Sequence, residues 1–225
     1  MWDESKAPAP FKPPRIHKFP LTHQTSDATA TIAPPPMGTY TPAADGSFLH
    51  DLAHGQLLPI TGSSPMQVIH TPGHTSDSIC LYIQDDRALY TADTVLGQGT
   101  AVFEDLGTYI ASLRELLEFQ SDYSVLYPGH GPVVTEGARV IGTYITHRLE
   151  REAQIVSVIE KPNSEGQPWS TWGIVSTIYA AYPQNLWEPA ARSVNQHLWK
   201  LQAEGKVKRL GGEGKDAQWE LLAKL

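Results

Sequence analysis

Residues 66–75 read Met-Gln-Val-Ile-His-Thr-Pro-Gly-His-Thr, a short apolar run followed by a proline–glycine turn with a histidine on either side. The apolar run predicts a β-strand over residues 66–70. Pro72 and Gly73 let the chain turn sharply, so we expect the imidazole of His74 to point away from the sheet. A polar side chain that could bind a ligand therefore stands at the end of a rigid element.

Two further polar side chains occupy equivalent places. Asp93 directly follows an apolar strand predicted at residues 88–91, and His130 follows a strand predicted at residues 124–127 and a second Pro-Gly turn. Imidazole and carboxylate groups are typical zinc ligands, and strand ends hold such ligands in a fixed geometry. His74, Asp93 and His130 are therefore the candidate metal ligands. The three together indicate a metal site more strongly than any one of them alone.

The remaining pattern of this region alternates strands with helices. A further apolar run predicts a strand at residues 79–83. Leucine, isoleucine and tyrosine then recur at helical spacing after Asp105, whose side chain can cap the helix, and a second, longer helix is predicted at about residues 137–160. These elements indicate an α+β fold.

The three ligand motifs resemble, in this order, the second half of the dizinc site of metallo-β-lactamase-fold hydrolases. The chain is most similar to the lactamase-beta-two-like branch, which includes polyketide-releasing thioesterases and an endoribonuclease. The resemblance covers about residues 66–225, and the narrower similarity is carried by residues 91–97, 102–106 and 144–148.

This resemblance implies a role for each candidate residue. His74 would be a ligand of the first zinc, Asp93 the carboxylate that bridges both ions, and His130 a ligand of the second. Two zinc ions lower the pKa of a shared water and polarise the scissile bond, so esters, thioesters, lactams and phosphodiesters are all accessible substrates. His147 and Arg148, on the predicted long helix, are candidate substrate-binding residues, with an ordinary exposed helix face as the alternative. No further catalytic residue is assigned.

One family motif is absent. The chain has no His-x-His-x-Asp-His sequence, the first-half signature of the family. Residues 22–28 keep its first His and its Asp but carry Thr25 and Ala28 where histidines belong. Either zinc would then have at most two protein ligands, where a catalytic site needs about three. We therefore expect weak zinc binding and weak or no hydrolysis.

The absence of the His-x-His-x-Asp-His motif also leads to an expectation about the fold. We expect the second half of an αββα sandwich, without its N-terminal half. An apolar sheet face would then be uncovered, which favours self-association.

Composition and charge divide the chain into three parts. Eleven of the 18 prolines lie in residues 1–65, which predicts an extended, loop-like segment. Residues 66–160 form the hydrolase-like part. Residues 161–225 carry eight Lys and Arg against six Asp and Glu, a net charge of +2, which leaves −9 for residues 1–160. We place a domain boundary near residue 161.

The third part has the pattern of a winged helix. Helices are predicted at residues 172–182 and 188–201, and strands at residues 207–210 and 218–222 flank a glycine-rich turn. Its net charge is too small for a dedicated nucleic-acid-binding module. We expect it to pack on the hydrolase-like part and to border a substrate groove.

Other features limit the possible classes. The sequence has no apolar run of about 18 residues and no basic-then-apolar start, so we expect no membrane span, no signal peptide and a cytoplasmic protein. The single cysteine, Cys80, cannot form an internal disulfide and is expected in the core.

Three functions remain open. The leading one is a zinc-dependent hydrolase of small-molecule or acyl-carrier-bound thioesters or of lactams, in secondary-metabolite biosynthesis. The others are a non-catalytic binding or regulatory protein and a nucleic-acid-processing hydrolase.

Overall fold

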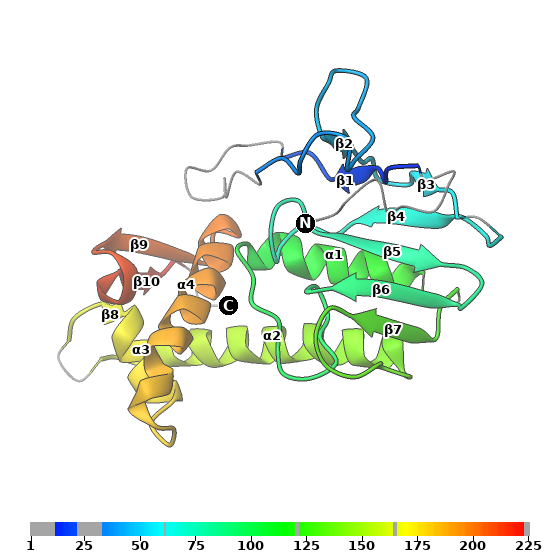
Figure 1. Ribbon diagram of the computed structural model, residues 1–225. Coiled ribbons are helices and arrows are strands. Elements are labelled where there is room, and N and C mark those ends of the chain that lie inside the picture. The colour runs from blue at the N-terminus through cyan, green and yellow to red at the C-terminus, as the bar shows by residue number, and fades with distance from the viewer. Residues whose placement is uncertain (1–11, 22–32, 61, 120–121, 164–165, 223–225) are drawn as a thin grey trace.

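The computed structural model describes residues 12–21, 33–60, 62–119, 122–163 and 166–222. Its largest sheet has five strands and lies beside the C-terminal module in Figure 1. Its strand order follows the sequence order, with antiparallel neighbours except for the last pair, which is parallel. The strands are β3 (Leu57–Leu58), β4 (Met66–His70), β5 (Ile79–Ile83), β6 (Ala88–Ala92) and β7 (Val125–Pro128). The strands predicted at 66–70, 79–83, 88–91 and 124–127 are confirmed to within a residue.

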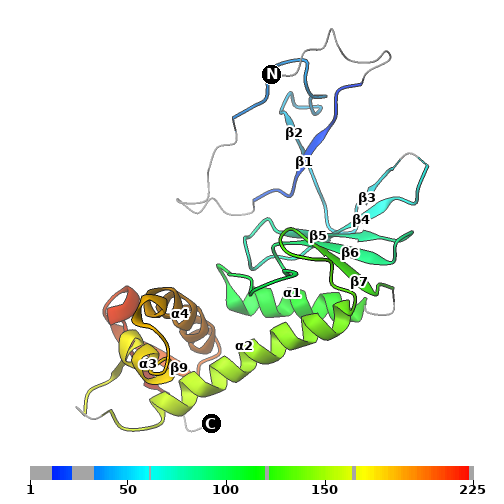
Figure 2. The ribbon, with the colours of Figure 1, turned by 60° about the horizontal axis from the view of Figure 1, so that its bottom comes forward.

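Two helices cover one face of this sheet, as Figure 2 shows. They are α1 (Leu106–Glu118), which connects β6 to β7, and α2 (Gly137–Ile159). The predicted cap of α1 is confirmed, because the Asp105 side chain accepts a hydrogen bond of 2.6 Å from the Thr108 backbone amide. The core between the sheet and the helices is built from buried apolar side chains, which include Ile69, Cys80, Leu89, Tyr109, Ile110, Leu113, Leu126 and Ile141.

The opposite face of the sheet is also apolar but is less buried. Leu81 pairs with Tyr90 across β5 and β6, so both side chains lie on this face. Tyr90 is 39% exposed and Leu81 is half-buried. Among the described residues no helix covers this face. That the chain is half of an αββα sandwich, and that this face drives self-association, stay predictions.

The proline-rich segment contains more structure than its composition predicts. Strands β1 (Ile16–Lys18) and β2 (Leu49–Asp51) form a separate parallel pair, and β3 adds to the edge of the main sheet. The buried side chain of Leu52 also lies in this segment. The main sheet therefore begins before the predicted start at Met66. Local propensity could not show this, because these strands are only two or three residues long and exist through long-range pairing.

The residues resembling the family's missing motif, 22–28, lie outside the described residues. Nothing in the structure therefore bears on them.

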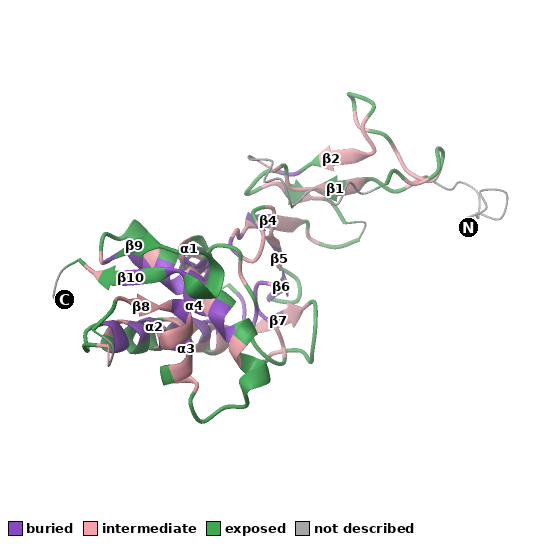
Figure 3. Ribbon diagram, turned by 90° about the vertical axis from the view of Figure 1, so that its left-hand side faces the viewer, coloured by how far each residue is buried: buried purple, intermediate pink, exposed green. Residues whose placement is uncertain are grey.

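The C-terminal module has the predicted winged-helix order and a core of its own. Its elements are β8 (Trp169–Ser170), α3 (Thr171–Ile178), η2 (Gln184–Leu186), α4 (Trp187–Ala203), β9 (Val207–Gly211), η3 (Gly214–Asp216) and β10 (Gln218–Leu221). In Figure 3 the buried residues gather where α3 and α4 pack on α2. Ile155 and Ile159 of α2 belong to this second core, so α2 joins the two parts, and the predicted boundary near 161 falls after a shared helix.

A chain of buried hydrogen bonds closes the winged-helix core. The Trp219 indole donates to Thr171 Oγ1 over 3.0 Å, and this hydroxyl donates to Asn195 Oδ1 over 2.7 Å. The Asn195 amide in turn donates to the Gly214 carbonyl over 3.0 Å. Each of these buried side-chain groups has a hydrogen-bond partner, so little free energy is lost by burying them. The network links α3, α4, η3 and β10.

The described helices do not include one that is long and apolar enough to span a membrane.

Candidate metal centre

Asp93 lies between His74 and His130 at one edge of the main sheet. Its Oδ2 is 3.8 Å from His74 Nε2, and its Oδ1 is 3.4 Å from His130 Nε2. Three loops that are far apart in the sequence supply these side chains. The structure thus brings together all three residues that the sequence suggested as metal ligands.

The sheet topology explains part of this convergence. Strands β6 and β7 run parallel, so the residues that follow them emerge at the same edge. The Gly129 amide donates a hydrogen bond of 2.7 Å to the Ala92 carbonyl, which ties the two strand ends together directly before Asp93 and His130. Ala92 has a positive φ of 43°, a conformation that non-glycine residues rarely adopt. Such strain is common where a backbone must place a functional side chain.

The loop that carries His74 is held by close packing on α1. Gly73 has a φ of 133°, and a Cβ atom there would lie 2.3 Å from the Tyr109 Cα. The Gly73 carbonyl also accepts a hydrogen bond of 2.7 Å from the Glu104 amide. Only glycine fits this position, so the turn predicted at Pro72-Gly73 is fixed by tertiary contact as well as by local preference.

The tautomer of His74 follows from its neighbour. Its Nδ1 lies 2.9 Å from the Val102 carbonyl oxygen, which can only accept a hydrogen bond. Nδ1 therefore carries the proton, and Nε2 presents its lone pair on the side of Asp93. Metal-bound histidines are usually oriented in this way, by donating the other ring N–H to a carbonyl or a carboxylate.

One oxygen of the Asp93 carboxylate, Oδ1, is buried and lacks a hydrogen-bond partner among the described residues. An unsatisfied buried acceptor costs about 1–3 kcal/mol, so a cation at this atom would remove a real penalty. The nitrogen and oxygen atoms of His74, Asp93 and His130 are thus of the types that bind a metal ion such as zinc.

The donor atoms do not, however, form a complete coordination shell. Within the described residues, no group of three or more His, Cys, Asp and Glu side chains is arranged to hold a metal ion. Weak zinc binding by this chain stays a prediction.

Helix α2 supports the metal-ligand region through the loop of residues 99–104, here called the strap. The Tyr144 hydroxyl donates to the Gly99 carbonyl over 3.1 Å, and Arg148 Nη2 donates to the Ala101 carbonyl over 2.8 Å. The next residue in the strap, Val102, provides the carbonyl that orients His74. Two side chains of α2 therefore hold the segment that fixes the His74 tautomer.

A cleft of about 1060 Å³ lies between the strap, α2 and α4. Both predicted substrate-binding residues, His147 and Arg148, line it. His147 is exposed, whereas the Arg148 guanidinium stacks on the Phe103 ring with its Cζ 4.7 Å from the ring centroid. Burial lowers the pKa of the Arg148 guanidinium, while the neighbouring hydroxyls of Tyr109 and Tyr144 oppose that shift. Arg148 therefore does not lie on an ordinary exposed helix face, which is the alternative to substrate binding. Substrate binding by the two residues stays a prediction.

Sequence reasoning missed most of this cleft. The missed residues include Phe103, Arg151, Arg192 and Trp199. The three-residue spacing of Arg148 and Arg151 places both on one helix face, which is a signal that could have been used. No pattern could have revealed Arg192 and Trp199 opposite them, because α4 faces α2 only in the folded chain.

Replacing Arg148 by alanine should destabilise the protein by about 1–3 kcal/mol, because the Ala101 carbonyl loses its donor and Phe103 loses its stacking partner. Urea unfolding followed by circular dichroism measures this loss. Arg139→Ala is the matched control on the same helix: its exposed pair with Glu136 should be worth less than about 1 kcal/mol. Equal losses in the two variants would show that Arg148 does not hold the strap.

Comparison with known families gives two matches. The metallo-beta-lactamase superfamily model matches residues 6–130, and the model of the beta-lactamase associated winged helix domain matches residues 170–219. The first match begins well before residue 66, so the resemblance extends through most of the proline-rich segment. The second agrees with the winged helix predicted from the sequence.

Curated relatives show the same relationship. The chain is 42% identical over 161 residues to the beta-lactamase-like protein 2 homolog of Drosophila melanogaster, covering 71% of this chain and 53% of the relative. It is 29% identical over 212 residues to the lactamase-like protein aptB of Emericella nidulans, covering 88% of this chain and 67% of that protein. With lactamase-like protein nscB of Trichophyton equinum the identity is 34% over 181 residues, covering 76% and 54%. The chain thus spans about half to two thirds of the length of these relatives.

Solved structures share the fold. A metallo-beta-lactamase family protein from Thermus thermophilus superposes with a TM-score of 0.59 at 18% identity, covering 82% of this chain and 60% of that one. A beta-lactamase domain protein from Burkholderia ambifaria gives a TM-score of 0.63 at 20% identity, covering 77% and 52%. By its sequence motifs, its fold and these matches, the chain belongs to the metallo-beta-lactamase superfamily, in the branch of beta-lactamase-like protein 2 and the lactamase-like proteins that carries a C-terminal winged helix.

Proposed function

We propose that this chain is a zinc-binding hydrolase module that acts on thioesters, either of small molecules or of acyl groups on a carrier. The observation that carries the proposal is the convergence of His74 and His130 on the partly unsatisfied carboxylate of Asp93. The family to which the chain belongs is hydrolytic, and the thioesterase function follows the resemblance to the branch with polyketide-releasing thioesterases. A role in secondary-metabolite biosynthesis is part of the same proposal.

Each residue has a distinct part in this chemistry. A bound zinc ion supplies Lewis acidity and lowers the pKa of water, so that a nucleophile forms near neutral pH. His74 and His130 offer their Nε2 atoms as ligands, and Asp93 offers a carboxylate between them. The Val102 carbonyl keeps the His74 proton on Nδ1. With only these three ligands we expect slow turnover.

Nucleic acid is the less favoured substrate because three lysines of the winged helix are already paired with glutamates. Lys215 contacts Glu188 at 2.6 Å, Lys206 contacts Glu204 at 2.9 Å, and Lys200 contacts Glu152 at 2.6 Å. These pairs reduce the charge available for phosphates.

Zinc binding tests the proposal directly. Titration of zinc into the metal-free chain, followed by calorimetry and by elemental analysis after dialysis, should show binding that Asp93→Ala weakens at least about tenfold, because both candidate sites lose their shared ligand. Asp216→Ala, which removes an exposed carboxylate of η3, is the matched control and should bind like the wild type. Zinc-dependent hydrolysis of an acyl thioester should follow the same order. Equal zinc binding by the wild type and Asp93→Ala would refute the proposal.

A further inference from the structure

The cleft between α2 and α4 has features that the proposed metal chemistry does not use. Its volume of about 1060 Å³ is in the range of small-molecule sites. The hydrolysis step needs only a metal and a scissile bond near Asp93. The shape, apolar surface and charge of the cleft therefore carry separate information about what binds there.

Large apolar side chains stand exposed around the cleft. Val102 is 72% exposed, Trp199 is 50% exposed and Leu186 is 45% exposed, and all three belong to the lining. They come from the strap, from α4 and from the turn before α4. Exposed apolar groups scattered singly are ordinary, but several around one hollow indicate a surface that a ligand covers.

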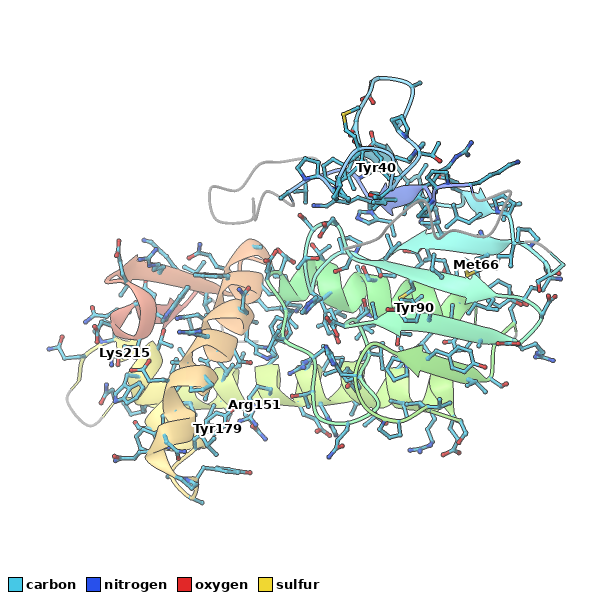
Figure 4. All side chains as sticks on the ribbon, in the orientation of Figure 1. Tyr40, Met66, Tyr90, Arg151, Tyr179 and Lys215 are labelled. Carbon is cyan, nitrogen blue, oxygen red and sulfur yellow. The ribbon has the colours of Figure 1, made fainter. Side chains whose placement is uncertain are left out.

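The same cleft gathers arginines. Arg148, Arg151 and Arg192 line it against Glu104 and Glu150, in a chain whose net charge is −7. Arg151 lays its guanidinium over the Tyr179 ring, with Cζ 4.6 Å from the centroid, and Figure 4 shows these two side chains together beside α2. Among the described residues, neither Arg151 nor Arg192 has a carboxylate within ion-pair distance, so the N–H donors of both can bind an anion.

A buried histidine, His197, lies behind the cleft, close to the same positive charges. His197 of α4 is fully buried, its ring is 6.3 Å from that of Phe103, and both ring nitrogens lack a partner among the described residues. Burial, and then the charges of Arg148, Arg151 and Lys200, lower the pKa of His197 to about 3. The ring is thus neutral at pH 7, chiefly because it is buried, and the positive charges of Arg148, Arg151 and Lys200 act in the same direction.

We propose that this cleft binds an amphipathic anion, with an aliphatic or aromatic body against Val102, Phe103 and Trp199 and a carboxylate or phosphate held by Arg151 and Arg192. This inference deepens the proposed function, on which it rests for its link to hydrolysis: the site selects acyl-type substrates that carry a negative group. Val102 connects the cleft to the candidate metal centre, because its side chain lines the cleft while its carbonyl orients His74.

Calorimetric titration of the metal-free chain in EDTA tests the cleft without involving zinc. The probes are decanoate, decyl phosphate and the uncharged decyl maltoside, each below its micellar concentration. We expect at least one of the anions to bind at least about tenfold more tightly than the uncharged probe, the advantage of a charge-assisted contact. Binding of only one anion identifies the preferred head group and supports the proposal.

Variants locate the binding site. Arg192→Ala should weaken the preferred anion about tenfold and leave the uncharged probe unchanged, whereas Trp199→Ala should weaken both probes. Both residues are exposed, so these variants should fold, and circular dichroism checks that they do. Arg139→Ala is the matched control, since Arg139 lies on α2 outside the cleft lining.

Several results would overturn the inference. One is equal binding of charged and uncharged probes, and another is anion binding that is indifferent to Arg192→Ala. Tight binding of an oligouridylate with no binding of either decyl anion would assign the arginines to nucleic acid instead. Failure of all the decyl probes while Asp93-dependent zinc binding persists would remove the cleft proposal and leave the metal proposal standing.

Discussion

Gly73→Ala should destabilise this protein by roughly 3 kcal/mol or more, because the new Cβ meets backbone atoms that cannot rotate away. That atom would lie 2.3 Å from the Tyr109 Cα and 2.5 Å from the Tyr109 amide nitrogen. A φ of 133° adds strain for any residue with a side chain. Relief requires the β4–β5 loop to move away from α1, and His74 moves with it. Urea unfolding followed by circular dichroism gives the free-energy change.

Gly46→Ala separates conformational strain from collision. Gly46 also has a positive φ, 84°, but a Cβ there would meet nothing within 4 Å. This variant should cost only about 1 kcal/mol, the ordinary penalty for a side chain in this region of φ. If both substitutions cost the same, the contact with α1 does not constrain the loop. A zinc titration of folded Gly73→Ala should also show weaker binding than that of Gly46→Ala.

Trp219→Ala should cost about 3–5 kcal/mol, which is typical of removing a large buried aromatic side chain. Trp219 is fully buried at the centre of the winged-helix core, and its indole donates to the buried hydroxyl of Thr171. The substitution leaves a cavity and takes a partner from the hydrogen-bond network that reaches Asn195. Because Asn195 also lines the cleft, ligand binding should weaken as well.

Two matched variants test this account of Trp219. Trp199→Ala, in the same module but half-exposed, should change stability by less than about 1 kcal/mol. Trp219→Phe should recover a large share of the lost stability because it refills most of the cavity. Thermal unfolding measures all three variants. A loss for Trp219→Ala as small as that for Trp199→Ala would mean that the module is not organised around this side chain.

Much of the fold could be predicted because its signals are local. Strands β4, β5 and β6 coincide with apolar runs that are bounded by turns. Asp105 caps α1, as predicted from its position directly before apolar residues at helical spacing. The order helix, helix, two strands identified the winged helix. In each case the residues that specify the element lie within it or beside it.

The elements that were missed depend on distant partners. Strands β1 and β2 pair across about thirty residues, as in the register of Ile16 with Leu49, and β3 consists of two residues that gain order from β4. Proline content predicted loops there, because composition carries no information about pairing. The shared role of α2 in both cores was missed for the same reason.

The amino-acid sequence by itself determined the kinds of groups at the site: two histidines and an aspartate, each placed at a strand end by short motifs. Only the tertiary structure decided that they meet, because the parallel pairing of β6 and β7 brings Asp93 beside His130 and the packing of Gly73 on α1 turns His74 toward the same carboxylate. It also decided that Arg148 holds the strap and that α4 faces α2 across an arginine-lined cleft. Ligand type is a property of single residues, whereas coordination and binding depend on distances between residues that only chain packing sets.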